Sequence, residues 1–269
     1  MTPFPFSSLK STVLAAAFVL ASPATFAQAF DAVRLYGAAA GTDRGTVGLG
    51  YIAGTQYPGS NERRNMVLPL LDYQWSNGWF AGTSNGLGYE FSKRADLQYG
   101  LRLSADLGRK ESRAEILRGM GDIDIKPQVG AFLNYFPSRE LFLTSSLRYG
   151  SGNDGRGLVI DLGAGHATQV APQWRLTMGA AVSLANADYM QAYFGVTPAQ
   201  AVSSSHAAYS AGAGVRDARI NGSLTYFVSQ RLTFTTALSI TTLLGDARDS
   251  PLTRKASSPT GVFAMAYAF

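Results

Sequence analysis

Few residues in this sequence have the types and spacing that hydrolytic chemistry requires. His166 follows Asp161 by five positions on one expected strand, so their side chains point to opposite faces. His206 lies beside Ser203-Ser204-Ser205 in a polar stretch, and a serine-rich loop alone is weak evidence for a nucleophile. We see no serine at a strand-to-helix nucleophile elbow. The pattern predicts that the protein is not an enzyme.

Residues that hold metals or nucleotides are equally scarce. The chain has no cysteine and two histidines, which excludes thiolate sites and argues against a histidine cluster. Glycine pairs occur at Gly48-Leu49-Gly50, Gly163-Ala164-Gly165 and Gly212-Ala213-Gly214, but none joins a strand to a helical pattern. Small residues on an inner barrel wall explain them better. We expect no cofactor.

The number and spacing of charged residues do not predict nucleic-acid binding. Charged residues make up 15% of the chain and the net charge is +5, of which only Lys10 lies in the first 27 residues. No basic run alternates with aromatic residues, so no nucleic-acid partner is expected. The excess of positive charge has two interpretations. It is either an ordinary basic surface, or it contacts anionic lipopolysaccharide or an anionic solute.

The N-terminus has the pattern of a signal peptide. Lys10 precedes an apolar run over 13–21, and small residues follow, with cleavage motifs that end at Ala27 and Ala29. The apolar run is about half of the ~20 residues that a transmembrane helix needs. We therefore predict a signal peptide over 1–27, with the cut possible after 29, and a single domain over 28–269.

From about Thr46 onward, apolar and polar residues alternate in segment after segment. In 97–108, for example, Leu97, Tyr99, Leu101, Leu103, Ala105 and Leu107 form one face. These segments run about 10–12 residues, the length that crosses a bilayer at a tilt. Lipid requires every backbone group to pair, so such strands must close on themselves. The sequence predicts one antiparallel transmembrane β-barrel, an all-β fold.

The same alternation places charges on the inner face. The expected inward set comprises Arg102, Asp106, Lys126, Arg148, Asp161, Arg175, Arg219 and Arg231. One interpretation is a water-filled lumen with a cationic bias that selects anionic solutes. The other is an interior network of ion pairs that fills a narrow barrel.

Loop lengths give the strand count. Tight connections fall near 76–78, 137–139, 171–173 and 229–231, and long ones at about 55–64, 109–123, 186–208 and 245–259. Bacterial barrels keep tight turns in the periplasm and long loops outside, so the two kinds must alternate. To keep that alternation, the segment 78–91 must be divided into two strands at Asn85-Gly86, a dipeptide typical of hairpin turns. This division gives about twelve strands. Ten strands, with 78–91 continuous, is the alternative.

The final strand carries a sorting pattern. Its bulky residues alternate with small ones up to the terminal aromatic residue, and they are Phe263, Met265, Tyr267 and Phe269. This arrangement resembles the C-terminal signal of outer-membrane barrels. It predicts a Gram-negative outer-membrane location and recognition by the assembly machinery there.

Several short phrases in the chain are similar to the MipA/OmpV family of outer-membrane proteins, the relatives of the MltA-interacting protein. They are Gly48-Leu49-Gly50 with Tyr57-Pro58-Gly59-Ser60, then 117–122, 193–196, 244–247 with Asp249-Ser250-Pro251, and Tyr267-Ala268-Phe269. The resemblance covers nearly all of 28–269 and carries no catalytic or ligand motif. It implies a structural or interaction protein, since one member is described as a scaffold between a murein hydrolase and a murein synthase. A narrow channel for small solutes, anionic ones included, is the alternative.

Overall fold

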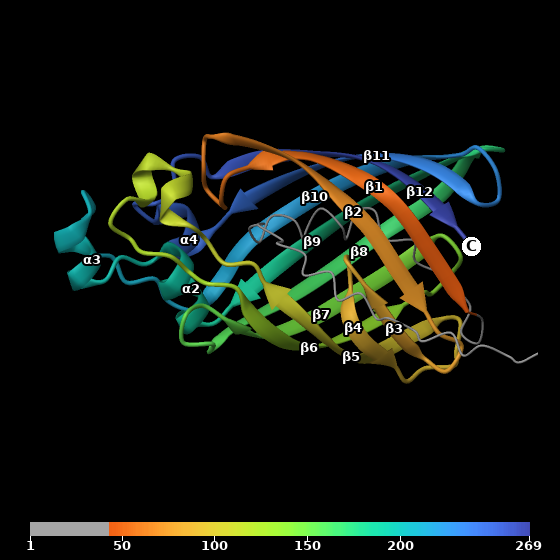
Figure 1. The fold of residues 1–269 in the computed structure, drawn as a ribbon, viewed down its shortest axis with the longest axis horizontal. Coiled ribbons are helices and arrows are strands. Elements are labelled where there is room, and N and C mark those ends of the chain that lie inside the picture. The colour runs from red at the N-terminus through yellow and green to blue at the C-terminus, as the bar shows by residue number, and fades with distance from the viewer. Residues whose placement is uncertain (1–42) are drawn as a thin grey trace, which may run out of the picture.

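The structure, a computed structural model, describes residues 43–269, and these residues form a closed antiparallel β-barrel. Twelve strands follow one another around the barrel in chain order, and β1 closes it by pairing with β12 (Figure 1). The strands are β1 (Arg44–Thr55), β2 (Arg63–Gln74), β3 (Trp79–Gly82), β4 (Gly86–Glu90), β5 (Leu97–Asp106), β6 (Lys126–Tyr135), β7 (Leu141–Ser151), β8 (Gly157–Ala171), β9 (Trp174–Ala185), β10 (Gly214–Phe227), β11 (Leu232–Leu243) and β12 (Ser257–Ala268). The prediction of twelve strands is confirmed. The predicted signal peptide lies outside the described residues.

The apolar and polar residues that alternate in the sequence lie on opposite faces of the barrel, apolar outside and polar inside. On β5, Leu101 is 56% exposed on the outside while Arg102 on the inside is half-buried. Other strands repeat this pattern, with Val67, Val129 and Phe263 among their exposed apolar side chains. An apolar outer belt of this kind is what a lipid-facing barrel requires.

Aromatic rings gather on the outer surface near one end of the barrel. Trp79 packs edge-on against Tyr89 with ring centroids 5.3 Å apart, and Trp174 lies 4.6 Å from Tyr226. The Tyr73–Trp75 pair and the Tyr89–Phe91 pair extend the group. Amphipathic rings at this height correspond to the interfacial girdle of membrane barrels.

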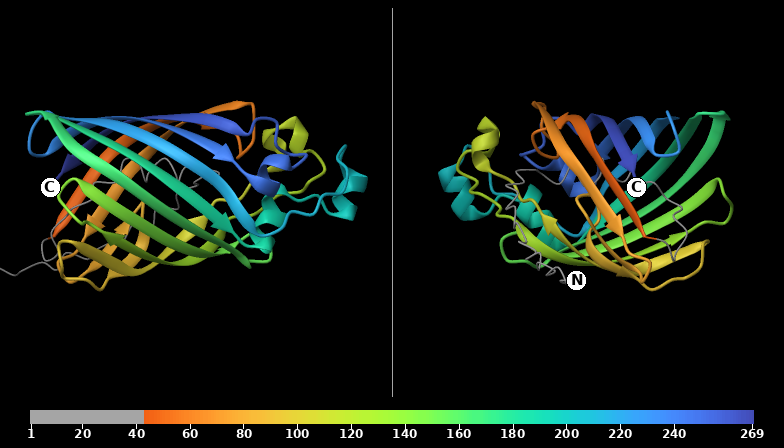
Figure 2. Two further views of the ribbon diagram at one scale, coloured as in Figure 1. Left: turned by 180° about the vertical axis from the view of Figure 1, so that it is seen from behind. Right: turned by 45° about the vertical axis from the view of Figure 1, so that its right-hand side comes forward.

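The two ends of the barrel differ. One end, here called the turn end, carries the short connections at 75–78, 91–96, 136–140, 172–173 and 228–231, and it holds Phe269 (Figure 2). The opposite loop end carries the connections 56–62, 107–125, 152–156, 186–213 and 244–256. Connections therefore alternate between the two ends as predicted, but their lengths do not alternate throughout. The β3–β4 turn, 83–85, and the connection 152–156 lie toward the loop end and are as short as those of the turn end.

A short hairpin breaks the regularity of the wall. Gly86 has a φ of +73°, and a Cβ there would lie 2.0 Å from the carbonyl oxygen of Leu103, so the turn requires glycine. β3 pairs with only Asp72–Gln74 of β2. The segment 63–70 therefore has a strand neighbour on its β1 side only, among the described residues.

The long loops fold into a cap over the loop end. They contain the 3-10 turns η1 (Glu111–Arg113) and η2 (Glu115–Leu117) and the helices α2 (Ala187–Phe194), α3 (Pro198–Ser203) and α4 (Gly245–Asp249), which Figure 1 shows together at that end. Tyr189, Met190 and Phe194 of α2 are buried in a common core with Ile123 and Leu243. No helix in residues 43–269 is long and apolar enough to cross a membrane.

Candidate functional site

The middle of the lumen holds a buried layer of opposite charges. Arg148 of β7 donates to Asp161 of β8 at 2.7 Å, and Ser183 of β9 donates to the other carboxylate oxygen at 2.6 Å. Arg219 of β10 lies against the same carboxylate, with Nη2 4.0 Å from Oδ1. The layer thus ties four consecutive strands together. All three of these predicted inward charges are on the inner face.

A second polar contact joins the cap to the barrel. The Tyr193 hydroxyl, on α2, donates to both carboxylate oxygens of Asp106 at 2.7 and 2.6 Å. Burial, and then the Asp106 charge, raise the pKa of Tyr193 far above the usual tyrosine value, so it stays a donor. Arg109 donates to the Tyr193 carbonyl at 2.9 Å. Asp106 is therefore a buried anchor for the cap at the loop end of β5.

A third contact was not predicted. Arg216 and Asp217 are both buried and paired with each other, because a bulge between Val215 and Asp217 interrupts the alternation of β10. The Arg216 guanidinium also lies 5.3 Å from the ring centroid of Tyr189 and donates to its hydroxyl at 3.0 Å. The sequence signal was the adjacent Arg-Asp pair just before the regular part of the strand.

The cap also connects loops from all sides of the barrel mouth. The Tyr57 hydroxyl donates to the Leu252 carbonyl at 3.0 Å, and the Ser250 hydroxyl donates to the Phe194 carbonyl at 2.6 Å. Burial raises the pKa of Tyr57 to about 12, so this donor is also retained at neutral pH. The loops β1–β2, β5–β6, β9–β10 and β11–β12 are in this way packed against one another.

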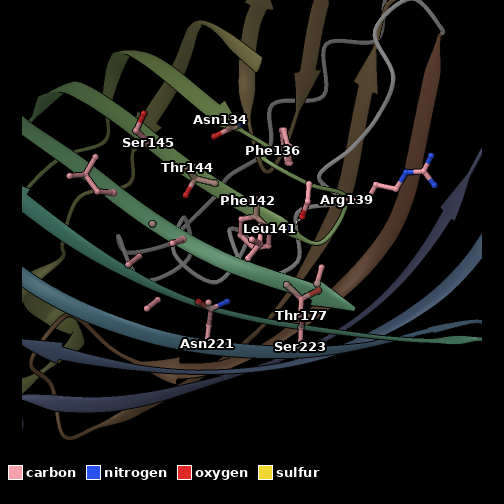
Figure 3. A pocket seen from close by; sticks show the side chains of 18 of the residues that line it. Asn134, Phe136, Arg139, Leu141, Phe142, Thr144, Ser145, Thr177, Asn221 and Ser223 are labelled. Carbon is pink, nitrogen blue, oxygen red and sulfur yellow. Dashed lines mark hydrogen bonds between the residues drawn. The ribbon is translucent and has the colours of Figure 1, made fainter. Parts of the chain in front are cut away.

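Between the charge layer and the turn end lies a cavity of about 530 Å³. Figure 3 shows its walls, with Thr144 and Phe142 on β7 facing Thr177 on β9 and Asn221 and Ser223 on β10. Ser138 and Arg139 of the β6–β7 turn stand at its mouth, and Asp161 and Arg219 form its inner end. The cavity therefore opens toward the turn end.

The remaining predicted inward residues lie at different heights. Arg102 is on the inner face and donates to the Ser146 hydroxyl of β7. Arg175 lines the cavity near its mouth, and Lys126 lies opposite Asp106 at the loop end, half-buried. Arg231 is the exception and the prediction for it is wrong. It precedes β11 in an exposed turn, and its guanidinium reaches the Tyr267 hydroxyl on the outer face at 3.4 Å.

The C-terminal pattern forms an outward face at the closing seam. Phe263, Met265 and Tyr267 are exposed on the outside of β12. The backbone of Phe269 exchanges hydrogen bonds of 2.9 and 3.0 Å with Gly45, and its ring covers the Gly45 α-carbon. The last residue therefore helps to close the barrel.

Residues of hydrolytic type are not assembled into a nucleophilic site in the described part of the chain. His166 faces Glu140 at 3.2 Å at the turn end, whereas His206 contacts the Ile116 carbonyl at 2.7 Å in the cap. Sequence reasoning overlooked Gly82-Thr83-Ser84-Asn85-Gly86, which matches G-x-S-x-G. That segment is the turn between β3 and β4, and the Ser84 hydroxyl donates to Asp72, so it is no strand-to-helix elbow. Residues 43–269 also contain no group of three metal-binding side chains.

Fold and lumen together define a twelve-stranded antiparallel barrel of the outer-membrane type, capped at one end. The family of the MltA-interacting protein MipA matches residues 47–269, and the chain belongs to this family. No curated protein matches the sequence significantly.

Several solved barrels resemble this one in fold. The KdgM porin is 8% identical with a TM-score of 0.44, over 83% of this chain and 99% of the porin. The NanC porin is 11% identical with a TM-score of 0.42, over 83% of this chain and 98% of that one. An outer-membrane channel from Pseudomonas putida F1 is 10% identical with a TM-score of 0.44, over 87% and 98%.

Proposed function

We propose that this protein is an outer-membrane interaction protein without enzymatic activity, which holds murein-hydrolysing and murein-synthesising enzymes together in the cell envelope. Membership of a family named for its interaction with MltA supports this role. The observation that carries it is the cap, because α2 and the neighbouring loops bury a shared core across the loop end. Loops packed together in this way form a fixed surface, which suits an interaction role.

The turn end is the surface that such a partner would meet. Bacterial barrels place tight turns and both termini in the periplasm, where murein enzymes act. Arg139, Gln173 and Arg231 are exposed on three of these turns. The outer belt would contact lipid and lipopolysaccharide, and the exposed β12 seam would be read by the assembly machinery.

Binding of purified MltA to the protein in nanodiscs tests the proposal. We expect capture by the wild type, and loss of capture when Arg139, Gln173 and Arg231 are all changed to Glu. The matched control changes exposed residues at the loop end, Arg118 and Arg156, to Glu and should retain capture. No capture by the wild type, or loss only in the control, would overturn the proposal.

Export precedes any such role. We infer that residues 1–27 are removed as a signal peptide, on the basis of Lys10 and the apolar run that follows it. N-terminal sequencing of protein extracted from outer membranes should begin at Gln28 or Phe30. Recovery of Met1 would contradict this.

A narrow channel is the second candidate, and the arginines that line the turn-end cavity favour it. Planar-bilayer recording separates the two. Discrete, anion-biased conductance steps in the wild type would support the channel, whereas their absence together with capture of MltA supports the interaction role.

A further inference from the structure

The turn-end cavity contains two guanidinium groups with unused hydrogen-bond donors. Arg219 is 5% exposed, and its Nη1 makes no hydrogen bond within residues 43–269. Its nearest acid, Asp161, already accepts from Arg148 and Ser183 at much shorter distances. A buried donor that stays unsatisfied is costly, so this end of the cavity favours an anion.

Arg175 is the second group. It lines the same cavity, on the inner face of β9, and no described residue holds its guanidinium. The other charges of the lining do not cancel these two. Asp161 is paired with Arg148, and Asp96 is paired with Arg94 at 2.6 Å in the adjacent turn. The free charge of the cavity is therefore positive.

Neutral polar groups connect the two arginines. In the β9–β10 register, Arg175 lies opposite Thr225, Thr177 opposite Ser223, and Arg219 opposite Ala181. The inner face between them presents Thr177, Asn221, Ser223 and Thr225, all of which line the cavity. Six residue steps of a strand span about 20 Å. The polar surface is thus long and narrow, with a cation toward each end.

Apolar surface lies beside this polar strip. Phe142 and Phe227 line the cavity with glycine and alanine positions such as Gly163 and Ala181. Small residues leave room above the strands, and aromatic faces contact the flat C–H surfaces of a ring. A mostly apolar lining with a few convergent polar groups is the usual composition of a small-molecule site.

We propose that this cavity binds a short acidic saccharide, with its carboxylate on Arg219, its hydroxyls along the β9–β10 strip and its ring faces against the phenylalanines. Arg175 holds the part of the ligand nearest the mouth. The ligand enters from the turn end, since the cap occupies the other. This site goes beyond the proposed partner role and does not depend on it.

Calorimetry on the folded protein in nanodiscs tests this with cellobiouronic acid and cellobiose, which differ only at one C6, a carboxylate in the acid and a hydroxymethyl group in cellobiose. We expect the acid to bind at least about ten-fold more tightly than cellobiose. Arg219→Gln should remove most of that preference, mainly by weakening the binding of the acid. Arg156→Gln, which removes one positive charge at the loop end, should change neither affinity.

Heat-modifiable gel mobility shows whether Arg219→Gln folds. If it does not, a second variant tests the proposal. Asn221→Leu keeps all charges and should weaken both sugars. Equal binding of the acid and cellobiose, or no binding of either, would overturn the proposal. Acetate binding as tight as that of cellobiouronic acid would replace the saccharide with a simple anion site. Capture of MltA is measured separately, so failure here leaves the interaction role intact.

Discussion

Leu101 and Arg102 are adjacent on β5 yet face opposite surroundings. Leu101 lies on the exposed apolar belt, whereas Arg102 points inward to Ser146. The alternation of the sequence was sufficient to predict this difference, because a strand has a side-chain period of two. It also placed Arg148 and Asp161 inside, although their pairing could not be derived from either strand alone.

The facing of these two residues leads to a testable difference in stability. Leu101→Arg puts a charge on the lipid face and should destabilise the folded barrel by about 2–4 kcal/mol. Arg102→Leu should cost less, since it alters an inner polar contact. Urea unfolding in lipid vesicles measures both, and a larger loss for Arg102→Leu would mean that interior contacts dominate.

Asp161 is the acceptor on which the central charge layer depends. Asp161→Asn leaves Arg148 and Arg219 without a counter-charge in a buried position, and we expect a loss of about 3–5 kcal/mol. Asp154→Asn, in an exposed pair with Arg156, is the control and should lose less than about 1 kcal/mol. The same vesicle unfolding assay compares them, and equal losses would refute the role of the layer.

At the scale of elements, most strands were predictable and the cap was not. The parity of tight and long connections required the split at Asn85-Gly86, and β3 and β4 confirm it. The helices were missed because α2 and α3 span only eight and six residues, too short for a clear period. A local signal existed for α3, where Thr197 and Gln200 form a capping box. The bulge at Val215/Asp217 hid Arg216, since one extra residue shifts the face.

β12 leads into Phe269, the residue that pairs with Gly45 at the seam with β1. Deletion of Phe269 removes two backbone hydrogen bonds to Gly45 and the ring that covers it, so the seam between β1 and β12 is weakened. We expect slower assembly and less folded, heat-modifiable barrel in membranes. Phe269→Tyr keeps both features and should assemble normally, and unchanged levels after deletion would contradict this role.

The whole molecule has two unlike ends, a capped one and an open one. The orientation proposed above places the cap outside the cell and the cavity in the periplasm. The chain contains no cysteine, so single cysteines give an unambiguous label. Val202 of α3 is 90% exposed at the loop end, and Gln230 is exposed at the turn end.

Labelling of intact cells with a membrane-impermeant maleimide tests this orientation. Val202→Cys should be modified in intact cells, and Gln230→Cys should be modified only after the outer membrane is permeabilised. The reverse pattern would turn the barrel over and direct the cap toward the murein enzymes.

The short hairpin also makes one side of the barrel thin. Strands of four and five residues reach about 13–17 Å, against roughly 33 Å or more for strands of ten residues or longer. Beside them, β2 pairs with β3 only over Asp72–Gln74. We expect lipid chains beside these two short strands to be compressed, because a bilayer thins to match a short apolar wall. In an outer membrane, such a barrel is expected to be surrounded by a bilayer of uneven thickness, and its thin sector should favour thinner membranes and neighbouring proteins of matching height.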